Sequence, residues 1–380
     1  MAKLVAIDIG NDSVKAIIQE NSLSTPRKYH IPNVVAKADE IRGVIALENR
    51  IEEGIHCKIT SGALSNNGGI YTIGNLATRS PNNSEPEPGQ EKGLSDQAVI
   101  MLLATLALDA AQYSESSDED VIEVKCALST GLPLREARRP EAKEQFRNKL
   151  RSKIHEIEFL QTPVIVGKKV RIEFDTIDVY SEGQAAMMHL VTDEYGKIKN
   201  EELLQKSILI NDIGGLSTDS AVIEHGIPDN MNSDGIRKGV SEYLDTIIEE
   251  VYEKFDHRIR SRRNLVRDVL LASGEKRNHI MVDGKLTSIQ DIVDNVLFEC
   301  AEDQHEHLDR MWKKVSDIEL CYQIGGGSAL IKDYLTKVNQ ESKHTYPLRF
   351  SEPEESIWMI VQSYWTMLVL SQKATVTEGV

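Results

Sequence analysis

Two short stretches of the chain place an aspartate inside a hydrophobic strand, followed two residues later by glycine and a polar turn. Residues 6–18 read AIDIGNDSVKAII, and residues 210–223 read INDIGGLSTDSAVI. One hairpin of this kind is weak evidence. Two, each opening one half of the chain, indicate an internal duplication in which two domains face each other across a cleft. The matching residues are Asp8 with Asp212 and Gly10 with Gly214.

The two turns have the composition of phosphate-binding loops. Glycine allows successive backbone N–H groups to converge into a concave nest for phosphate oxygens. Carboxylates beside phosphates repel them unless a cation lies between, and Mg²⁺ held largely through its waters suits Asp8 and Asp212. The sequence therefore predicts a nucleotide–Mg²⁺ site. Its further candidate contacts are Asn11, Asp12, Ser13 and Lys15 in the first turn, and Gly215, Leu216, Ser217 and Thr218 in the second.

A third glycine turn follows another apolar strand, in the stretch CYQIGGGSALIKDYL. Gly325, Gly326 and Gly327 let the backbone approach a ligand closely, and Ser328 opens a helix whose N-terminus favours an anion. A lone triple-glycine turn is often only structural. As the third such turn in one chain, it predicts a further part of the binding site.

The stretch DVYSEGQAAMMHL places Glu182 at a junction between a strand and a helix. Two interpretations stay open. Glu182 is an acid in the first helical turn that complements the helix dipole, or its carboxylate orients the water that attacks a terminal phosphate. Gln184 is the alternative candidate for the second role.

Composition excludes several classes of protein. The chain has 380 residues and a net charge of −16, which argues against a general nucleic-acid binder but leaves room for one local basic patch. The four cysteines are widely separated, which predicts reduced thiols in a cytoplasmic protein. The start of the chain has no export signal pattern. His305 and His307 are two residues apart and are predicted to lie on a solvated helix face.

Strand and helix patterns alternate along the chain, which predicts an α/β protein. Helices are expected at 96–112, at 141–154 and from Glu182, Gly239, Asn264 and Ile289. The segment 356–372 is too short and too polar to span a bilayer and is predicted to be a buried amphipathic helix. The polar stretch 79–93 predicts a mobile surface loop, and residues 115–120 predict a solvated acidic turn.

Taken together, the motifs resemble the superfamily of actin, heat-shock chaperones and sugar kinases, in the order phosphate turn, connecting helix, second phosphate turn and adenosine turn. Within it the chain is most similar to the bacterial actin-like plasmid-segregation ATPases of the ParM family. The resemblance implies duplicated actin-like, ribonuclease H-like domains that flank a nucleotide cleft. Domain I would comprise residues 1–185, with an insert at about 25–90, and be completed by a C-terminal helix at 352–380. Domain II would comprise residues 186–351.

The resemblance also implies an activity and partners. It implies hydrolysis of ATP, or of GTP, coupled to polymerisation, with Asp8 to Lys15 and Gly214 to Thr218 at the phosphates and Gly325 to Ser328 at the adenosine. Glu182 would be the catalytic acid, and Asp212 would be a further catalytic residue. Filaments would segregate plasmid DNA through a DNA-bound adaptor protein, so no direct DNA contact and no membrane contact is expected.

The sequence departs from the family pattern at two places, and two other functions stay open. Leu216 stands where threonine is common, and Gln362 and Trp365 stand in a connecting helix where small residues are common. The alternatives are a small-molecule kinase of the same superfamily and a bacterial actin homologue in cell division or shape. The polar end of the chain, SQKATVTEGV, speaks against membrane attachment.

Overall fold

The computed structural model describes residues 2–21, 24–39, 51–87, 89–113, 121–151 and 153–378, with the backbone alone from 373 onward. It divides into two compact units, Met1–Glu201 with Trp358–Val380, and Glu202–Ile357. The acidic turn predicted at 115–120 lies outside the described residues. The predicted domain limits at residues 185 and 352 stay a prediction.

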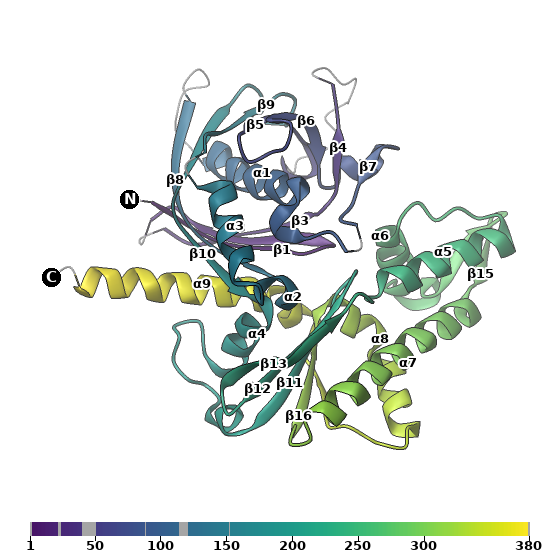
Figure 1. Ribbon diagram of the computed structural model, residues 1–380. Coiled ribbons are helices and arrows are strands. Elements are labelled where there is room, and N and C mark those ends of the chain that lie inside the picture. Colours follow the sequence, from purple (N-terminus) through teal and green to yellow (C-terminus); the bar gives the residue numbers. More distant parts are fainter. Residues whose placement is uncertain are drawn as a thin grey trace. The chain divides into compact units, whose positions relative to one another are not determined.

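The first unit is built on a mixed sheet in the order β3-β2-β1-β8-β10-β9-β5-β6-β4-β7 (Figure 1). Its strands are β1 (Lys3–Ile9), β2 (Ser13–Gln19), β3 (Arg27–Pro32), β4 (Val35–Lys37), β5 (Ile55–Ser61), β6 (Gly68–Ile73), β7 (Asn83–Ser84), β8 (Val121–Leu132), β9 (His155–Phe159) and β10 (Lys169–Ser181). Its helices include α1 (Asp96–Tyr113), α2 (Leu134–Ala137), α3 (Pro140–Leu150) and α4 (Glu182–Val191).

The second unit has a sheet in the order β13-β12-β11-β16-β17 and a separate two-stranded hairpin. The sheet strands are β11 (Ser207–Ile213), β12 (Thr218–Glu224), β13 (Ile227–Ile236), β16 (Leu320–Ile324) and β17 (Leu348–Phe350), and the hairpin strands are β14 (His279–Val282) and β15 (Lys285–Ser288). The helices are α5 (Ser241–Phe255), α6 (Arg262–Leu265), α7 (Gln290–Lys314) and α8 (Gly325–Glu341).

Five strands of the first sheet repeat the topology of the whole second sheet. In the first unit, β3, β2 and β1 are successively antiparallel, and β8 and β10 then continue in parallel. In the second unit, β13, β12 and β11 are antiparallel, and β16 and β17 continue in parallel. The duplication predicted from the two aspartate turns is therefore present in the strand order of each unit, and the predicted α/β fold class is confirmed.

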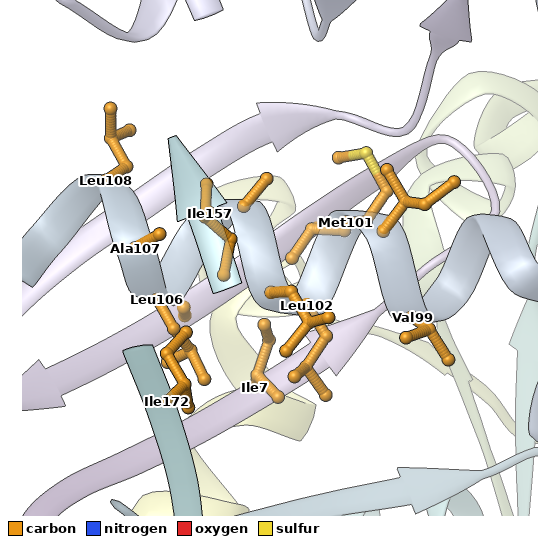
Figure 2. Close-up of a cluster of buried hydrophobic side chains, with 14 of the residues drawn as sticks. Ile7, Val99, Met101, Leu102, Leu106, Ala107, Leu108, Ile157 and Ile172 are labelled. Carbon is orange, nitrogen blue, oxygen red and sulfur yellow. The ribbon is translucent and has the colours of Figure 1, made fainter. Parts of the chain in front are cut away.

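The core of the first unit forms around α1, which is apolar on nearly every face and is therefore enclosed. Figure 2 shows Val99, Met101, Leu102 and Leu106 of this helix among buried side chains that include Ile7 of β1. Ile157 of β9 and Ile172 of β10 belong to the same cluster. The predicted helix at 96–112 is confirmed, and it supports the strand that carries Asp8.

The C-terminal helix α9 (Pro353–Glu378) confirms the prediction of a buried helix near the end of the chain. Met359, Tyr364 and Leu368 are fully buried, and the Ser363 hydroxyl donates to the Ala185 carbonyl oxygen of α4 at 2.5 Å. Among the helices that the structure describes, none has the length and apolar character needed to cross a membrane.

Two predictions from the second half of the chain are wrong. His305 and His307 are buried, because α7 packs against both the sheet and α8, so they do not lie on a solvated face. The helix expected from Asn264 is only a short segment, α6 followed by a π-helical turn at Val266–Leu270. In the first unit, the helix predicted at 141–154 ends at Leu150, and residues from His155 form β9.

Candidate functional site

The first aspartate turn is a tight β-hairpin between β1 and β2. The Gly10 N–H donates to the Ser13 carbonyl oxygen at 3.1 Å. A Cβ atom on Gly10 would lie 2.8 Å from that oxygen and 3.2 Å from the Lys15 Nζ atom, so a larger residue does not fit. Asp8 pairs with Lys15 across the hairpin. The turn therefore brings one carboxylate and one ammonium to the same end of the sheet.

Neighbouring side chains fix this turn from outside. The Asn33 amide side chain donates to the Gly10 carbonyl oxygen at 2.8 Å, and the Asn33 N–H donates to the Asp12 carbonyl oxygen at 2.9 Å. The buried Ser13 hydroxyl lies 2.9 Å from Nε2 of His30. Asn11 is half-buried and Asp12 is exposed at the tip. Asn33 and His30 were not identified from the sequence.

The second aspartate turn repeats the hydrogen bond of the first. The Gly214 N–H donates to the Ser217 carbonyl oxygen at 2.9 Å. Backbone N–H groups at the start of α5 then hold the turn, because Val240 donates to the Gly214 carbonyl oxygen at 3.1 Å and Ser241 to that of Gly215 at 2.8 Å. The same four-residue geometry therefore occurs once in each unit.

The side chains of the second turn have distinct surroundings. The Thr218 hydroxyl is buried and lies 2.8 Å from the Lys238 carbonyl oxygen and 3.1 Å from Oε1 of Gln304. This arrangement ties β12 to α7. Leu216 and Ser217 are half-buried at the tip.

The third glycine turn forms the first turn of α8, which begins at Gly325 rather than at Ser328. Gly325 has a φ of +85°, and a Cβ atom there would lie 2.2 Å from Oδ1 of Asp212. The Gly325 N–H donates to the Ser356 hydroxyl at 2.7 Å, and the Ser328 hydroxyl donates to the Gly325 carbonyl oxygen at 2.8 Å. Asp212 of the second aspartate turn and the predicted adenosine turn thus lie side by side.

The other two glycines of this turn differ in their surroundings. A Cβ atom on Gly327 would lie 2.7 Å from the Ile213 carbonyl oxygen, whereas one on Gly326 would meet no atom within 4 Å. Gly326 is exposed at the N-terminus of α8. An uncovered helix N-terminus presents N–H groups that favour an anion.

Asn211, the residue before Asp212, belongs to a network of buried polar side chains within the second unit. Ser220 donates to Oδ1 of Asn211 at 2.5 Å, and Asn211 donates to Oε1 of Gln323 at 2.9 Å. Nε2 of His307 lies 2.8 Å from the Ser220 hydroxyl, so the neutral imidazole donates to it. Burial lowers the pKa of His307 to about 4. The network connects β11, β12, β16 and α7.

Glu182 begins α4 at the end of β10, as predicted, and it contacts a lysine that the sequence analysis did not identify. The Lys92 Nζ atom donates to Oε1 of Glu182 and lies 3.9 Å from Oδ1 of Asp8. The side chains of Lys92 and Glu182 are only 10 % and 14 % exposed. Gln184 lies two residues along α4, and positions two apart on a helix do not share a face.

Charge and burial together shift the pKa values of Glu182 and Lys92. Burial raises the pKa of the Glu182 carboxyl, and Asp8 adds to this effect while Lys92 opposes it. Burial alone would lower the pKa of the Lys92 ammonium, but Glu182 and Asp8 outweigh it and raise that pKa. One ammonium among several carboxylates stays protonated.

The position of Lys92 corrects one prediction. Residues 79–93 were predicted to form a surface loop, but Gly93 is buried and Lys92 is largely covered. No local pattern identifies such a residue, because its partner Glu182 is 90 positions away in the chain. Among the residues that the structure describes, no group of three or more His, Cys, Asp or Glu side chains could hold a metal ion.

The family models match both units. An N-terminal domain model of actin-like proteins matches residues 6–184, and a C-terminal domain model of the Alp7A type matches residues 207–346. Both aspartate turns, Glu182 and the third glycine turn lie within these ranges. Among curated proteins, no relative matches the chain.

Solved structures of similar fold cover nearly the whole chain. ParM of Bacillus thuringiensis with ATP is 22% identical with a TM-score of 0.72, and the match covers 98% of this chain and 99% of that one. The actin-like protein Alp7A is 14% identical with a TM-score of 0.77 and complete coverage of both chains, 100% each. An archaeal actin homologue is 15% identical with a TM-score of 0.68, covering 97% and 99%. The chain therefore belongs to the actin-like proteins, with a C-terminal domain of the Alp7A type, and it shares the fold of ParM.

Proposed function

We propose that this protein is a nucleoside triphosphatase that assembles into filaments in the nucleotide-bound state and loses them after hydrolysis. The observation that carries the proposal is the repeated turn. Gly10 to Ser13 and Gly214 to Ser217 close with the same backbone hydrogen bond, each two residues after an aspartate. Each of the two duplicated units thus carries a turn whose backbone geometry suits the binding of phosphate oxygens.

The three predicted turns and Glu182 have distinct roles in this proposal. The turns at Gly10 and Gly214 bind phosphates through backbone N–H groups, and the turn at Gly325 binds the adenosine. Glu182 orients the attacking water, a role for a carboxylate in phosphoryl transfer. The bulk of the catalysis in such reactions comes from positioning and electrostatic stabilisation.

The carboxylates of the two aspartate turns fit Mg²⁺ only as an ion that is held mainly by phosphates and water. Asp8 is the carboxylate of the first unit that can accept hydrogen bonds from such waters, and Asp212 is its counterpart in the second. The described residues lack a cluster of metal-binding side chains, and Mg²⁺ commonly keeps several waters beside nucleotide phosphates. When bound, the ion would neutralise phosphate charge.

Adenine nucleotides are the proposed substrates. Three structures of the Bacillus thuringiensis relative contain ATP, ADP and AMPPNP. Chains of this fold that bind those ligands support ATP over other triphosphates for this protein, although GTP has to be compared directly.

We further propose that the filaments move plasmid DNA and that a DNA-bound adaptor protein connects the two. The net charge of −16 supports indirect contact, because a strongly acidic chain is repelled by phosphate backbones. The resemblance to ParM supports this cellular role. A plasmid-loss assay with and without the gene in its natural host tests it.

Sedimentation of the purified chain tests the assembly step. We expect protein in the pellet with Mg²⁺ and ATP, less with GTP or ADP, and none without nucleotide. Phosphate release should accompany assembly. Protein that stays in the supernatant under every nucleotide contradicts filament formation, and phosphate transfer that requires an added sugar would instead indicate a small-molecule kinase.

A further inference from the structure

Lys92 lies beside two carboxylates of the candidate site, but the proposed function gives it no role. Its ammonium contacts Glu182 and lies 3.9 Å from the carboxylate of Asp8. Both carboxylates come from the ends of the two core strands that flank β8, Asp8 from β1 and Glu182 from the residue after β10. Lys92 itself comes from a one-turn helix at Lys92–Leu94, far from both in sequence.

The backbone of this one-turn helix is clamped by Glu136 of α2. One carboxylate oxygen of Glu136 accepts the Lys92 N–H at 2.8 Å, and the other accepts the Gly93 N–H at 3.0 Å. Both oxygens of a single carboxylate thus hold two successive amides, which fixes the turn in position and orientation.

Two further contacts secure the same turn. Arg139 donates to the Glu91 carboxylate at 2.7 Å, and Lys149 of α3 donates to the Leu94 carbonyl oxygen at 2.6 Å. The residues on both sides of Lys92 are therefore anchored to α2, α3 and their junction. A lysine side chain on an anchored turn loses less freedom on forming an ion pair than one on an unrestrained loop.

The consequence for Glu182 is geometric. Glu182 is the first residue of α4, and rotation about its side-chain bonds would otherwise let the carboxylate point in several directions. The contact with Lys92 selects the direction that lies toward Asp8. A water-orienting carboxylate needs such restraint, because catalysis falls steeply when a group is displaced by about 1 Å.

We propose that Lys92 is a positioning residue that holds the Glu182 carboxylate in the direction required for nucleotide hydrolysis, with Glu136 fixing the turn that carries Lys92. This inference rests on the proposed function, since Glu182 has a reaction to serve only if the chain hydrolyses nucleotide. Lys92 acts through Glu182, so its removal should slow turnover with little effect on nucleotide affinity.

The test compares Lys92→Met, Lys92→Arg and the exposed-lysine control Lys125→Met, whose side chain is 70% exposed. Phosphate release at saturating ATP gives kcat, and titration with a fluorescent ATP analogue gives Kd. We expect Lys92→Met to lower kcat by about 100-fold with Kd changed by less than about threefold. Lys92→Arg should restore much of kcat, and Lys125→Met should match the wild type.

A double-mutant cycle separates this role from a structural one. If Lys92 acts through Glu182, adding Lys92→Met to Glu182→Gln should change kcat by less than about twofold. Thermal unfolding of each variant identifies misfolded protein, and Lys92→Arg, which keeps the charge, provides the comparison if Lys92→Met unfolds.

Three results would overturn the inference. Turnover of Lys92→Met within about twofold of wild type excludes a positioning role, and a full effect of Lys92→Met on the Glu182→Gln background excludes action through Glu182. A weaker Kd with unchanged kcat would make Lys92 a nucleotide-binding group instead. Absence of phosphate release from the wild-type chain contradicts the proposed function itself, whereas the other outcomes contradict only the role of Lys92.

Discussion

The carboxylate of Asp212 packs directly against the backbone of Gly325, leaving no room for even a methyl group between them. A Cβ atom on Gly325 would lie 2.2 Å from Oδ1 of Asp212 and 2.6 Å from the Ile213 carbonyl oxygen. The φ of +85° at Gly325 independently favours glycine. The second aspartate turn and the start of α8 are therefore packed directly against each other.

Gly325→Ala should weaken both the fold and nucleotide binding. The added methyl group must displace Asp212 or the Ile213 carbonyl, and the backbone conformation is strained for alanine. We expect a loss of about 2 kcal/mol or more in the free energy of unfolding, measured by urea denaturation. ATP affinity should fall in parallel, because Asp212 moves.

Gly326→Ala is the matched control for that variant. It lies one residue along in the same helical turn, and its Cβ atom would meet no atom within 4 Å. Alanine favours a helix over glycine by up to about 1 kcal/mol, so the unfolding free energy should stay the same or rise. Equal destabilisation by the two variants would contradict the packing described here.

Asp109 should be one of the most sensitive charged positions in the first unit. This fully buried carboxylate accepts hydrogen bonds from Lys3 at 2.8 Å, from Arg27 at 2.6 Å and from Tyr29 at 2.9 Å. Burial alone would raise its pKa, but Arg27 and Lys3 outweigh that effect and hold the pKa below its usual range. Asp109→Asn removes the buried counter-charge of Lys3 and Arg27, which then keep only the exposed carboxylate of Glu20, and it should cost about 3 kcal/mol in a urea titration.

An exposed ion pair provides the comparison for Asp109. Glu173 and Lys125 are 3.7 Å apart and their side chains are 68% and 70% exposed. Solvent screens such a pair, so Glu173→Gln should change the unfolding free energy by less than about 1 kcal/mol. A similar loss of unfolding free energy in Asp109→Asn and Glu173→Gln would contradict a larger contribution to stability from the buried ion pairs of Asp109.

The second unit should lose stability in mild acid because of His307. Its folded pKa of about 4 lies below the usual histidine value, so the unfolded chain takes up the proton first as pH falls. The free energy of unfolding that depends on neutral His307 is fully present above about pH 6.5 and is lost as the pH falls towards 4. The total loss is about 3 kcal/mol. Urea titrations of the wild type between pH 7 and pH 4.5 measure it.

His307→Gln tests the assignment of that pH dependence. Glutamine can still donate to the Ser220 hydroxyl but does not titrate, so its unfolding free energy should fall less over the same pH range. An identical pH dependence in wild type and variant would place the titrating group elsewhere.

The parts of the site that could be predicted are those whose chemistry lies in consecutive residues. Asp8 with Gly10, Asp212 with Gly214 and the three glycines from Gly325 each form one local turn, so strand pattern and glycine placement were sufficient. The α/β fold class followed from the alternation of strand and helix patterns along the chain.

The parts that could not be predicted depend on contacts between distant segments. Lys92 lies in a polar stretch with the composition of a surface loop, and contacts with distant residues such as Glu136 hold its turn beside Glu182. His305 and His307 stand in the charged sequence EDQHEHLDR, which indicates a solvated helix, whereas α8 and the sheet bury them. Burial of a polar stretch is set by its partners, which a single sequence does not show.

The most direct test of the proposed function follows light scattering and phosphate release together after ATP is added to the wild-type chain and to Glu182→Ala. We predict that wild-type scattering rises, reaches a plateau and decays as phosphate appears. Glu182→Ala should reach a similar plateau that persists, with phosphate release slowed by about 100-fold or more. Equal phosphate release and equal decay in the two proteins would contradict Glu182 as the catalytic residue, and scattering that does not respond to nucleotide would contradict the filament-forming nucleoside triphosphatase.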